Sequence, residues 1–396
     1  MKKSILLFII FLFPFVVKAE DINLAENAKS AIMIEASTGE IIYEKNAHEK
    51  LPPASMTKMM SMLIIMENIE AGKLKWDEIV TASVKASSMG GSQIFLEAGE
   101  KMSVLELLKG IAIGSGNDAT MALAERISGS ESEFVKLMNS KAQDLKLKNT
   151  NFKNPTGLDA ENHYSSAYDM AIIAKELVKH KKILEFTSIY EDYLRQNTDK
   201  KFWLVNTNRL VRFYQGVDGL KTGYTEEAGY CLTSTAKKNG LRLITVVMNE
   251  PDSNTRNNET TAMLDYGFNA YSVDNVIKSD TSLGKIEVEM GNKKKVDFYA
   301  LEDINILNNN SKEKRNVSYN IKLDKVVSPL KKNDVVGKLE VIENNKVISQ
   351  VDLIVLEDVS KANIIKVFIR NLEDIIKGIS WKNNALCVIF DIFYKN

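Results

Sequence analysis

Three short segments, far apart in the chain but in a fixed order, constrain this sequence most, because a working fold has to bring them together. They are Ser-x-x-Lys at 55–58, Ser-Gly-Asn at 115–117 and Lys-Thr-Gly at 221–223. They supply a hydroxyl with an amine, a second hydroxyl with an amide, and a cation. The Ser-x-x-Lys spacing recurs at four other serines, but Lys-Thr-Gly occurs once. The ordered set therefore predicts a single site for acyl transfer.

The context of the first segment predicts a reactive serine at the start of a helix. Two prolines precede Ser55, and residues 56–70 form a strongly apolar helical pattern. The unpaired amides of a first helical turn favour negative charge beside the serine. Lys58 lies one turn further on the same face, within reach of the hydroxyl. Burial near a second cation, for which Lys221 is the candidate, lowers a lysine pKa enough to make the amine a base. The alternative is that Ser55 only caps the helix and Lys58 is solvated.

The other two segments have the chemistry of a substrate cleft. A hydroxyl at Ser115 is placed to relay a proton to a leaving amine, and the Asn117 amide to hold a peptide bond. The alternative is that Asn117 or the next residue caps the following helix. Lys221 attracts a carboxylate and Thr222 donates to it, while Gly223 allows a backbone to approach closely. The alternative for Lys221 is an ordinary strand lysine.

Local patterns predict an α/β domain, with an antiparallel sheet and helices packed on it. Residues 31–34 and 41–43 are apolar β-formers around a turn-prone cluster. A second hairpin joins 230–235 to 241–248 through Asn239-Gly240, a dipeptide typical of tight hairpin turns. The Lys-Thr-Gly segment comes directly before this hairpin and is expected on a neighbouring strand. Helical patterns fill the interval, at 105–111 behind Ser103 and Glu106 with capping-box spacing, and at 119–127, 133–145 and 166–178.

With these motifs in this order, the chain resembles the active-site serine D,D-peptidases, and among them the low-molecular-weight penicillin-binding proteins that are D-alanyl-D-alanine carboxypeptidases. The resemblance runs from about residue 31 to 249 and includes the segments 154–159, 161–165, 167–170 and 217–220. It implies a D,D-peptidase/β-lactamase-like fold. It also implies removal of the terminal D-alanine from peptidoglycan stem peptides, covalent inhibition by β-lactams, and no metal or organic cofactor.

The same resemblance assigns individual roles. Ser55, Lys58 and Ser115 are the implied catalytic residues, and Ser55 carries the acyl group. The backbone amides of Ser55 and Tyr224 are the implied oxyanion hole. Asn117, Lys221, Thr222 and Gly223 are the implied substrate-binding residues. Arg256 is a further candidate for the terminal carboxylate, because a guanidinium suits a bidentate hold.

Two other functions compete with this interpretation. A class A β-lactamase usually carries Ser-Asp-Asn as its second motif, and a loop glutamate followed by asparagine four residues later. Here residue 116 is glycine, and Glu161 is followed four residues later by Ser165. Both departures favour the peptidase. A catalytically inactive penicillin sensor or wall-binding module is the second alternative, and the complete set of motifs argues against it.

Composition excludes several other classes. The chain has 396 residues, with 52 basic and 52 acidic side chains, so no global field favours nucleic acid. Its three histidines lie at no spacing that suggests a metal site or a Ser-His-Asp arrangement. The two cysteines, Cys231 and Cys387, are expected to be free, because a domain with a large core does not need a disulfide framework.

The beginning of the chain predicts export. Residues 1–19 combine a basic start, an apolar stretch at 5–17 and a cleavage-compatible end, as in a signal peptide. The apolar stretch reaches only about 20 Å as a helix, short of the roughly 30 Å hydrocarbon core, which disfavours an uncleaved anchor. The catalytic domain is expected at 20–282. We therefore expect the protein at the outer face of the cytoplasmic membrane, or secreted if nothing holds it there.

The end of the chain has a different texture. Alternating segments at 285–289, 317–323, 337–342 and 347–356 predict a small all-β domain at 283–358, as in the resembled family. The tail, 359–396, begins with an amphipathic helical pattern that resembles an in-plane membrane anchor. The alternative is a helix packed on the β domain. The apolar stripe of this tail consists of Ile365, Phe368, Ile369, Leu372, Ile375, Ile376 and Ile379.

Overall fold

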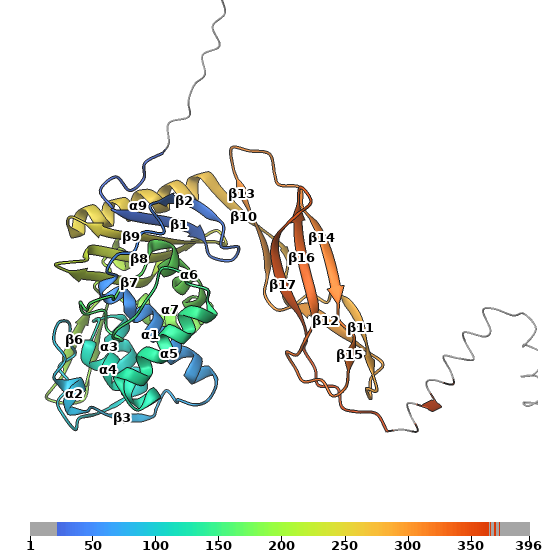
Figure 1. Cartoon of the computed structure of the whole chain (residues 1–396), viewed down its shortest axis with the longest axis horizontal. Coiled ribbons are helices and arrows are strands. Elements are labelled where there is room, and N and C mark those ends of the chain that lie inside the picture. Colours follow the sequence, from blue (N-terminus) through green and yellow to red (C-terminus); the bar gives the residue numbers. More distant parts are fainter. Residues whose placement is uncertain (1–21, 364, 366–367, 370–371, 373–396) are drawn as a thin grey trace, which may run out of the picture.

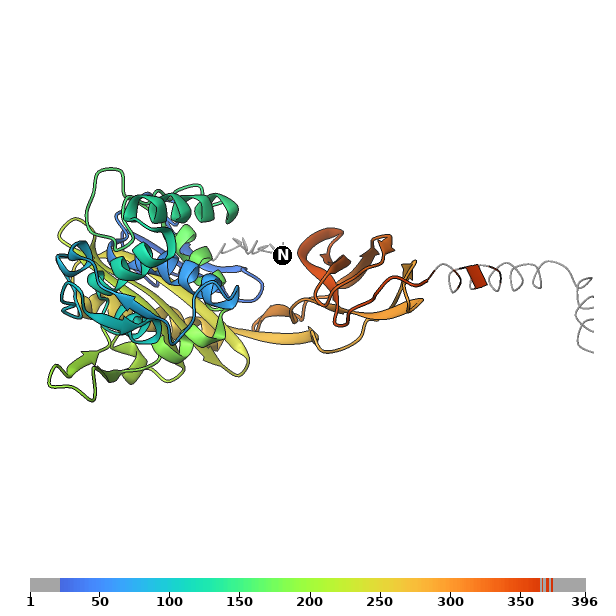
Figure 2. The ribbon, with the colours of Figure 1, turned by 90° about the horizontal axis from the view of Figure 1, so that it is seen from below.

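The computed structural model describes residues 22–363 together with 365, 368, 369 and 372. The expected signal peptide, Cys387 and most of the expected tail helix lie outside these residues. The described chain has two parts, an N-terminal α/β domain and a C-terminal β domain that extends away from it (Figures 1 and 2). Among the described helices, none combines the length and the apolar character needed to cross a membrane.

The α/β domain is built on a five-stranded antiparallel sheet with the strand order β2-β1-β9-β8-β7. Both expected hairpins are confirmed, and the Lys-Thr-Gly segment lies in β7, next to β8, as expected. Because β7 is an edge strand, one of its two edges pairs with no other strand of this sheet. The strand also packs on the turn of Ser55 and on α7 (Lys181–Thr187). The strands are β1 (Ser30–Glu35), β2 (Ile41–Lys45), β7 (Val217–Thr225), β8 (Gly229–Lys238) and β9 (Leu241–Glu250).

Helices cover both faces of this sheet. Alternate residues of β9 belong to two different hydrophobic clusters, as the twofold period of a strand requires. One cluster contains α6, and the other contains α9, which packs on β8 and β9 (Figure 1). The expected helices are all present. The longer helices are α1 (Lys58–Glu70), α3 (Val104–Ala112), α4 (Asn117–Ser128), α5 (Glu131–Asp144), α6 (Ala167–Leu177), α7 (Lys181–Thr187) and α9 (Ser253–Ala270).

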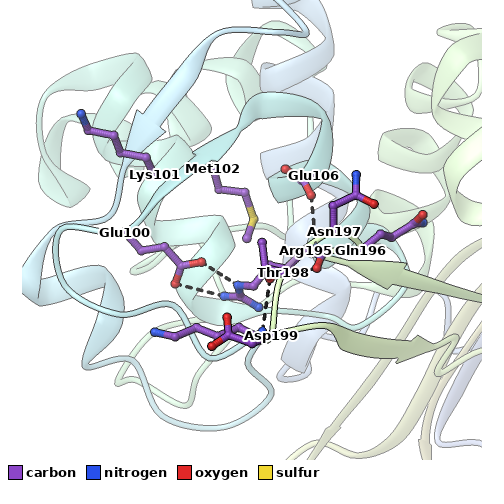
Figure 3. Close-up of a pocket in the computed structure, with 10 residues that line it drawn as sticks. Glu100, Lys101, Met102, Glu106, Arg195, Gln196, Asn197, Thr198 and Asp199 are labelled. Carbon is purple, nitrogen blue, oxygen red and sulfur yellow. Dashed lines mark hydrogen bonds and ion pairs between the residues drawn. The ribbon is translucent and has the colours of Figure 1, made fainter.

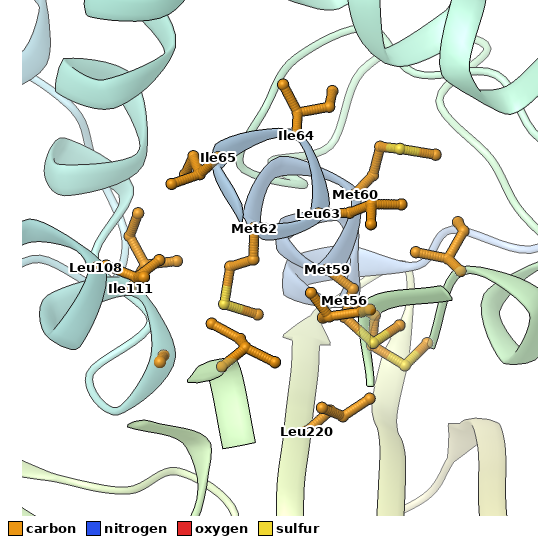
Figure 4. Close-up of a cluster of buried hydrophobic side chains, with 14 of the residues drawn as sticks. Met56, Met59, Met60, Met62, Leu63, Ile64, Ile65, Leu108, Ile111 and Leu220 are labelled. Atoms are coloured by element: carbon orange, nitrogen blue, oxygen red, sulfur yellow. The ribbon is translucent and has the colours of Figure 1, made fainter. Parts of the chain in front are cut away.

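Helix α1 forms the centre of the larger cluster. Every residue from Lys58 to Met66 is buried, and apolar side chains surround the helix on all sides (Figure 4). A helix that is apolar all round is stable only inside a core. Each fully buried side chain of this size contributes roughly 1.5–3 kcal/mol by leaving water. The core therefore fixes the position of Ser55, which lies just ahead of this helix.

Smaller elements complete the first domain, and the sequence patterns did not predict them. Two short antiparallel pairs join β3 (Ile79–Thr81) to β4 (Lys101–Ser103), and, as a hairpin, β5 (Glu191–Leu194) to β6 (Phe202–Val205). Two short helices are α2 (Val84–Ser87) and α8 (Leu210–Phe213). The single described cysteine, Cys231, is free and buried, as expected.

The C-terminal domain is all-β within the described residues, as expected. Its main sheet has the order β14-β16-β17-β12-β11-β15, and the four predicted strand segments are confirmed in β11, β14, β16 and β17. A two-stranded ribbon pairs β10 with β13 and joins this sheet to the first domain (Figure 2). The strands are β10 (Tyr271–Ile277), β11 (Gly284–Glu289), β12 (Lys295–Ala300), β13 (Ile304–Asn309), β14 (Ser318–Leu323), β15 (Val326–Val327), β16 (Val335–Glu343) and β17 (Lys346–Val355).

One arginine side chain spans the junction between the two domains. Arg315 Nη1 lies 2.6 Å from Glu40 Oε1 in the first domain, and its Nε lies 2.8 Å from Glu343 Oε1 in the second. The side chain is 19% exposed, so water screens these charge-assisted hydrogen bonds only in part. Both carboxylates hold the pKa of the Arg315 guanidinium above its usual range. The junction is thus fixed by charge as well as by the β10–β13 ribbon.

Candidate active site

Ser55 lies in a single 3₁₀ turn, η1 (Ala54–Thr57), and the α-helix begins at Lys58. The sequence predicted a helix start here but not its tighter geometry. In a 3₁₀ turn, residues three apart eclipse one another, which aims the side chain of Lys58 at Ser55. The Lys58 Nζ donates to Ser55 Oγ at 2.8 Å. The nucleophile and its candidate base are therefore already in hydrogen-bond contact.

Among the described residues, no carboxylate forms an ion pair with the amine of Lys58. Its side chain is 0% exposed, so the alternative of a solvated lysine is wrong. Its second hydrogen bond goes to the carbonyl oxygen of Thr156, at 2.7 Å. Burial, and then the nearby charge of Lys221, lower the pKa of Lys58 well below its ordinary value, and the more weakly felt Asp118 opposes them. Both dominant causes favour the neutral amine, which is the form that can take a proton from Ser55.

The loop after α5 braces the 3₁₀ turn from outside. Gly157 adopts φ +85°, and a Cβ there would lie 1.9 Å from the carbonyl oxygen of Ala54, so only glycine fits. The His163 Nδ1 accepts from the amide of Lys153 at 3.2 Å, so its Nε2 carries the proton and donates to Thr57 Oγ1 at 2.9 Å. Burial lowers the pKa of His163 to about 4, which keeps the ring neutral near pH 7. This histidine is a structural support of the site.

Ser115 and Asn117 enter the site from the junction of α3 and α4. Ser115 is 3% exposed and adopts the left-handed φ of +61°. Gly116 is the N-cap of α4 and Asn117 its first residue, so the alternative that Asn117 is an N-cap is wrong. The Asn117 Nδ2 instead donates to the carbonyl oxygen of Gly90 at 2.6 Å. Its Oδ1 is buried and has no hydrogen-bond partner within the described chain, which leaves an acceptor for a ligand N–H.

The residue between them has no room for a side chain. A Cβ on Gly116 would lie 2.9 Å from Asp118 Oδ1 and 3.1 Å from the Ile94 side chain. Asp118 is buried, and its carboxylate accepts hydrogen bonds from the backbone amides of Ile94 at 3.0 Å and Leu96 at 2.9 Å. An aspartate at 116, as in the class A β-lactamase motif, would bring a second carboxylate against the first. The local packing therefore disfavours that motif here.

Strand β7 forms the opposite wall. Lys221 is 1% exposed, and burial, followed by the charge of Arg256, lowers its pKa to about 7. Thr222 Oγ1 donates to Thr207 Oγ1 at 2.7 Å. A Cβ on Gly223 would lie 2.7 Å from the Pro53 carbonyl oxygen and 3.3 Å from the Ser55 nitrogen. Glycine at 223 thus lets the strand lie against the turn that carries Ser55.

The remaining two predicted residues flank this wall. Tyr224 is 54% exposed, and its ring lies 4.4 Å from that of Tyr230. Arg256 lies in the first turn of α9 and is 6% exposed, and its Nε and Nη2 donate to Asn257 Oδ1. In the described part of the chain no acidic side chain forms an ion pair with it. A buried guanidinium without a counter-ion, close enough to Lys221 to lower its pKa, is suited to a carboxylate from outside.

The structure brings the first and third segments into contact, because Lys58 binds Ser55 and Gly223 lies against the turn that carries Ser55. The second segment leads into α4, which packs on α1, and Asp118 directly after it is close enough to Lys58 to influence its pKa. The structure also adds residues that the sequence did not indicate. Thr156, Gly157 and His163 fall in the segments that carry the resemblance, although no role was predicted for them. Thr207 and Gly90 carry no sequence signal, because a hydroxyl or a backbone carbonyl becomes informative only when its partner is known.

Comparison with known proteins gives one consistent picture. A family model described as "D-alanyl-D-alanine carboxypeptidase" matches residues 16–252, and one described as "Penicillin-binding protein 5, C-terminal domain" matches residues 271–361. The D-alanyl-D-alanine carboxypeptidase DacF of Bacillus subtilis is 52% identical over 353 residues, covering 89% of this chain and 91% of the relative.

Solved structures agree with the sequence matches. The crystal structure of penicillin-binding protein 5 from Haemophilus influenzae superposes with a TM-score of 0.66 at 33% identity, covering 85% of this chain and 98% of that one. Penicillin-binding protein D2 from Listeria monocytogenes, in an ampicillin-bound form, gives a TM-score of 0.55 at 32% identity, covering 61% of this chain and 98% of that one.

Proposed function

The chain belongs to the D-alanyl-D-alanine carboxypeptidase family, and from that premise we propose that Ser55 is its nucleophile and Lys58 its general base. The family makes it a serine-type carboxypeptidase of peptidoglycan. The observation that carries the residue assignment is the 2.8 Å contact between Lys58 Nζ and Ser55 Oγ, made by an amine with no exposed surface. A neutral amine at this distance accepts the hydroxyl proton as the oxygen attacks.

Acylation then follows from the geometry around Ser55. Its Oγ attacks the carbonyl carbon of the penultimate D-alanine, and its proton passes to Lys58. The amides of Ser55 and Tyr224 hold the developing oxyanion, and each such donor is worth about 10²–10³ in rate. We assign to Ser115 the return of a proton to the leaving D-alanine amine. Water afterwards hydrolyses the acyl-enzyme and restores the Ser55 hydroxyl.

Substrate binding uses the unpaired groups of the two walls. The Asn117 Oδ1, which has no partner of its own, accepts the amide N–H of the stem peptide. Lys221, Thr222 and Arg256 bind the terminal carboxylate, which supplies the anion that Arg256 lacks in the described chain. Gly223 keeps β7 close against the turn that carries Ser55, so that the carboxylate-binding residues and the nucleophile act on one substrate. β-Lactams acylate Ser55 through the same contacts.

Two assays on the same preparation test this function. We expect release of D-alanine from a stem pentapeptide, together with negligible turnover of a chromogenic cephalosporin that nonetheless labels the protein covalently. Rapid cephalosporin hydrolysis without D-alanine release would identify a β-lactamase. Covalent labelling without either turnover would identify a penicillin sensor.

Replacing Lys221 by methionine is expected to shift the pH dependence of acylation. The reaction needs neutral Lys58, so the acylation rate falls as pH drops below the pKa of Lys58. The charge of Lys221 helps to hold that pKa down. Without it the pKa of Lys58 rises, and the acidic limb of the profile moves to higher pH. The measurement is the rate of acylation by fluorescent penicillin against pH, with exposed Lys237→Met on β8 as the matched control. An unmoved acidic limb would show that the two amines are not coupled.

For the location of the protein, we propose export through a signal peptide at 1–19 and peripheral attachment to the membrane through the tail. Four positions of the tail stripe lie within the described residues, and all four are helical. Ile365, Phe368, Ile369 and Leu372 are 70%, 63%, 51% and 42% exposed. Exposed apolar side chains at helical spacing support an in-plane membrane helix over one packed on the β domain.

Removing the tail is expected to abolish binding to lipid vesicles. The comparison uses the full mature chain, a chain that ends at Asn363, and the single variant Phe368→Glu, all measured by co-sedimentation. Ending at Asn363 keeps Val359, which is fully buried in the core of the β domain and pairs with Leu330. Tyr319→Glu is the control, because it places the same charge on an exposed aromatic position of β14. Equal binding by the full and shortened chains would rule out the anchor.

A further inference from the structure

A segment without regular structure forms the wall that holds Asn117. Residues 90–96, here called the wall segment, contain neither helix nor strand. Asn117 contacts this segment twice, because its amide donates to the Ser92 carbonyl oxygen at 2.7 Å and its Nδ2 to the Gly90 carbonyl oxygen at 2.6 Å. Asp118 binds the amide of Ile94 in the same segment. The direction of the Asn117 amide therefore depends on where the wall segment lies.

On its other side, the wall segment accepts hydrogen bonds from the side chain of Arg195, which belongs to a different element. Arg195 follows β5, at the turn of the β5–β6 hairpin. Its Nη1 donates to the Ile94 carbonyl oxygen at 3.0 Å and its Nη2 to the Phe95 carbonyl oxygen at 3.2 Å. Its Nε and Nη2 also bind the two oxygens of Glu100, at 2.6 and 3.1 Å. Arg195 and Glu100 line a surface recess of about 410 Å³. Figure 3 shows this pair, and it also shows the backbone amide of Arg195 bound to the Glu106 carboxylate.

The burial of this pair separates it from the other contacts of the hairpin. The side chains of Arg195 and Glu100 are 9% and 18% exposed, so their bidentate contact is largely shielded from water. Lys200, in the same turn, also reaches toward this region and pairs with Glu97, but those side chains are 56% and 67% exposed. An exposed pair of this kind contributes little. Ile94 is thus held at its amide by Asp118 and at its carbonyl by Arg195.

We infer that Arg195 is a positioning residue for the reaction, which clamps the wall segment and thereby fixes the Asn117 amide for the substrate. This inference rests on the proposed role of Asn117 in binding the peptide N–H. Without the guanidinium, the carbonyls of Ile94 and Phe95 lose their side-chain donor, and Glu100 keeps only its contact with the Glu97 amide among the described residues. The hydrogen bonds that remain to the wall segment from side chains then come from α4, beside the packing of Phe95 on Phe202. Within the described chain the Asn117 Oδ1 has no hydrogen-bond partner, so the contact of Nδ2 with the Gly90 carbonyl oxygen sets the direction of the side-chain amide. A displacement of about 1 Å at such a group can cost up to about 10²-fold in rate.

The test measures the second-order rate of acylation by fluorescent penicillin and kcat/KM for D-alanine release. Arg195→Ala is expected to lower both about tenfold. Arg195→Lys keeps the charge for Glu100 but cannot reach both carbonyls, and is expected to be intermediate. Lys200→Ala, in the same turn, is the control and is expected to match the wild type. Because Arg195 does not touch Lys58 or Lys221, the pH dependence of the remaining activity is expected to be unchanged.

A double-substitution cycle separates positioning from a general loss of structure. If Arg195 acts through Asn117, then adding Arg195→Ala to Asn117→Ala causes little further loss of acylation. A full additional tenfold loss in that background, or wild-type acylation by Arg195→Ala, would overturn the inference. If Arg195→Ala does not fold, as thermal unfolding will show, Arg195→Lys and Glu100→Gln are tested in the same cycle. Failure of the proposed function is distinct, because Asn117→Ala alone would then leave acylation unchanged.

Discussion

Ser55→Ala is expected to abolish covalent labelling by fluorescent penicillin and to reduce D-alanine release by at least about 10⁴-fold. The oxygen that it removes is the one that receives the Lys58 hydrogen bond at 2.8 Å. No acyl-enzyme can form without it. Residual activity would come only from binding and from the amides around the oxyanion. The measurements are labelling on a denaturing gel and an enzymatic assay for free D-alanine.

A second serine, in the helix α1 that follows the turn of Ser55, supplies the control. Ser61 is fully buried, and its Oγ donates to the Pro155 carbonyl oxygen at 2.7 Å. Ser61→Ala removes a hydrogen bond worth about 1 kcal/mol of stability but leaves the nucleophile in place. It is expected to be labelled like the wild type. Labelling of Ser55→Ala at the wild-type rate would show that another residue is acylated.

Lys58→Met is expected to slow acylation by about 10²–10⁴-fold, the usual contribution of a general base. Methionine fills a similar volume but cannot take the proton from Ser55. The same substitution changes the pH dependence of stability. In the wild type the pKa of Lys58 is lower in the folded state than in the unfolded state. Between those two pKa values the unfolded chain binds one more proton, so the free energy of unfolding rises with pH.

The methionine variant lacks this pH dependence, so the difference in the free energy of unfolding between variant and wild type changes with pH. Relative to the wild type, Lys58→Met is expected to be most stable near neutral pH and to lose that advantage as pH approaches about 10.4, the ordinary lysine pKa. Denaturant unfolding at several pH values measures the difference. Lys58→Arg is the matched control, since a guanidinium stays charged, and we expect it to be both inactive and less stable. A difference that does not change with pH would mean that Lys58 is protonated in the fold.

Most of the fold follows from local patterns in the sequence. Asn239-Gly240 fixes a tight turn between two alternating segments, and β8 and β9 follow directly. Ser103 with Glu106 marks the start of α3, where the Ser103 Oγ accepts the amide of Glu106. The order of the three motifs also indicated a common site. Each of these signals lies within a few residues of the structure that it predicts.

The rest of the site depends on contacts between distant residues, and for these the sequence has no local signal. The Lys58 amine donates to the carbonyl of Thr156, which is 98 residues further along the chain. Arg195 binds the carbonyl of Ile94 across 101 residues. Backbone carbonyls occur at every residue, so nothing in the pattern distinguishes these two. The four-residue strands of the β5–β6 hairpin also have no clear sequence pattern, although this hairpin positions Arg195.

The two ion pairs of Arg315 have a mechanical consequence. Any rotation of the α/β domain about the β10–β13 ribbon would have to break the contact with Glu40 or with Glu343. The ion pairs therefore favour one relative orientation of the two domains, which sets the distance of Ser55 from the C-terminal end of the β domain. If that end lies on the membrane, as proposed, the enzyme reaches only the peptidoglycan stem peptides that lie at one distance from the membrane surface.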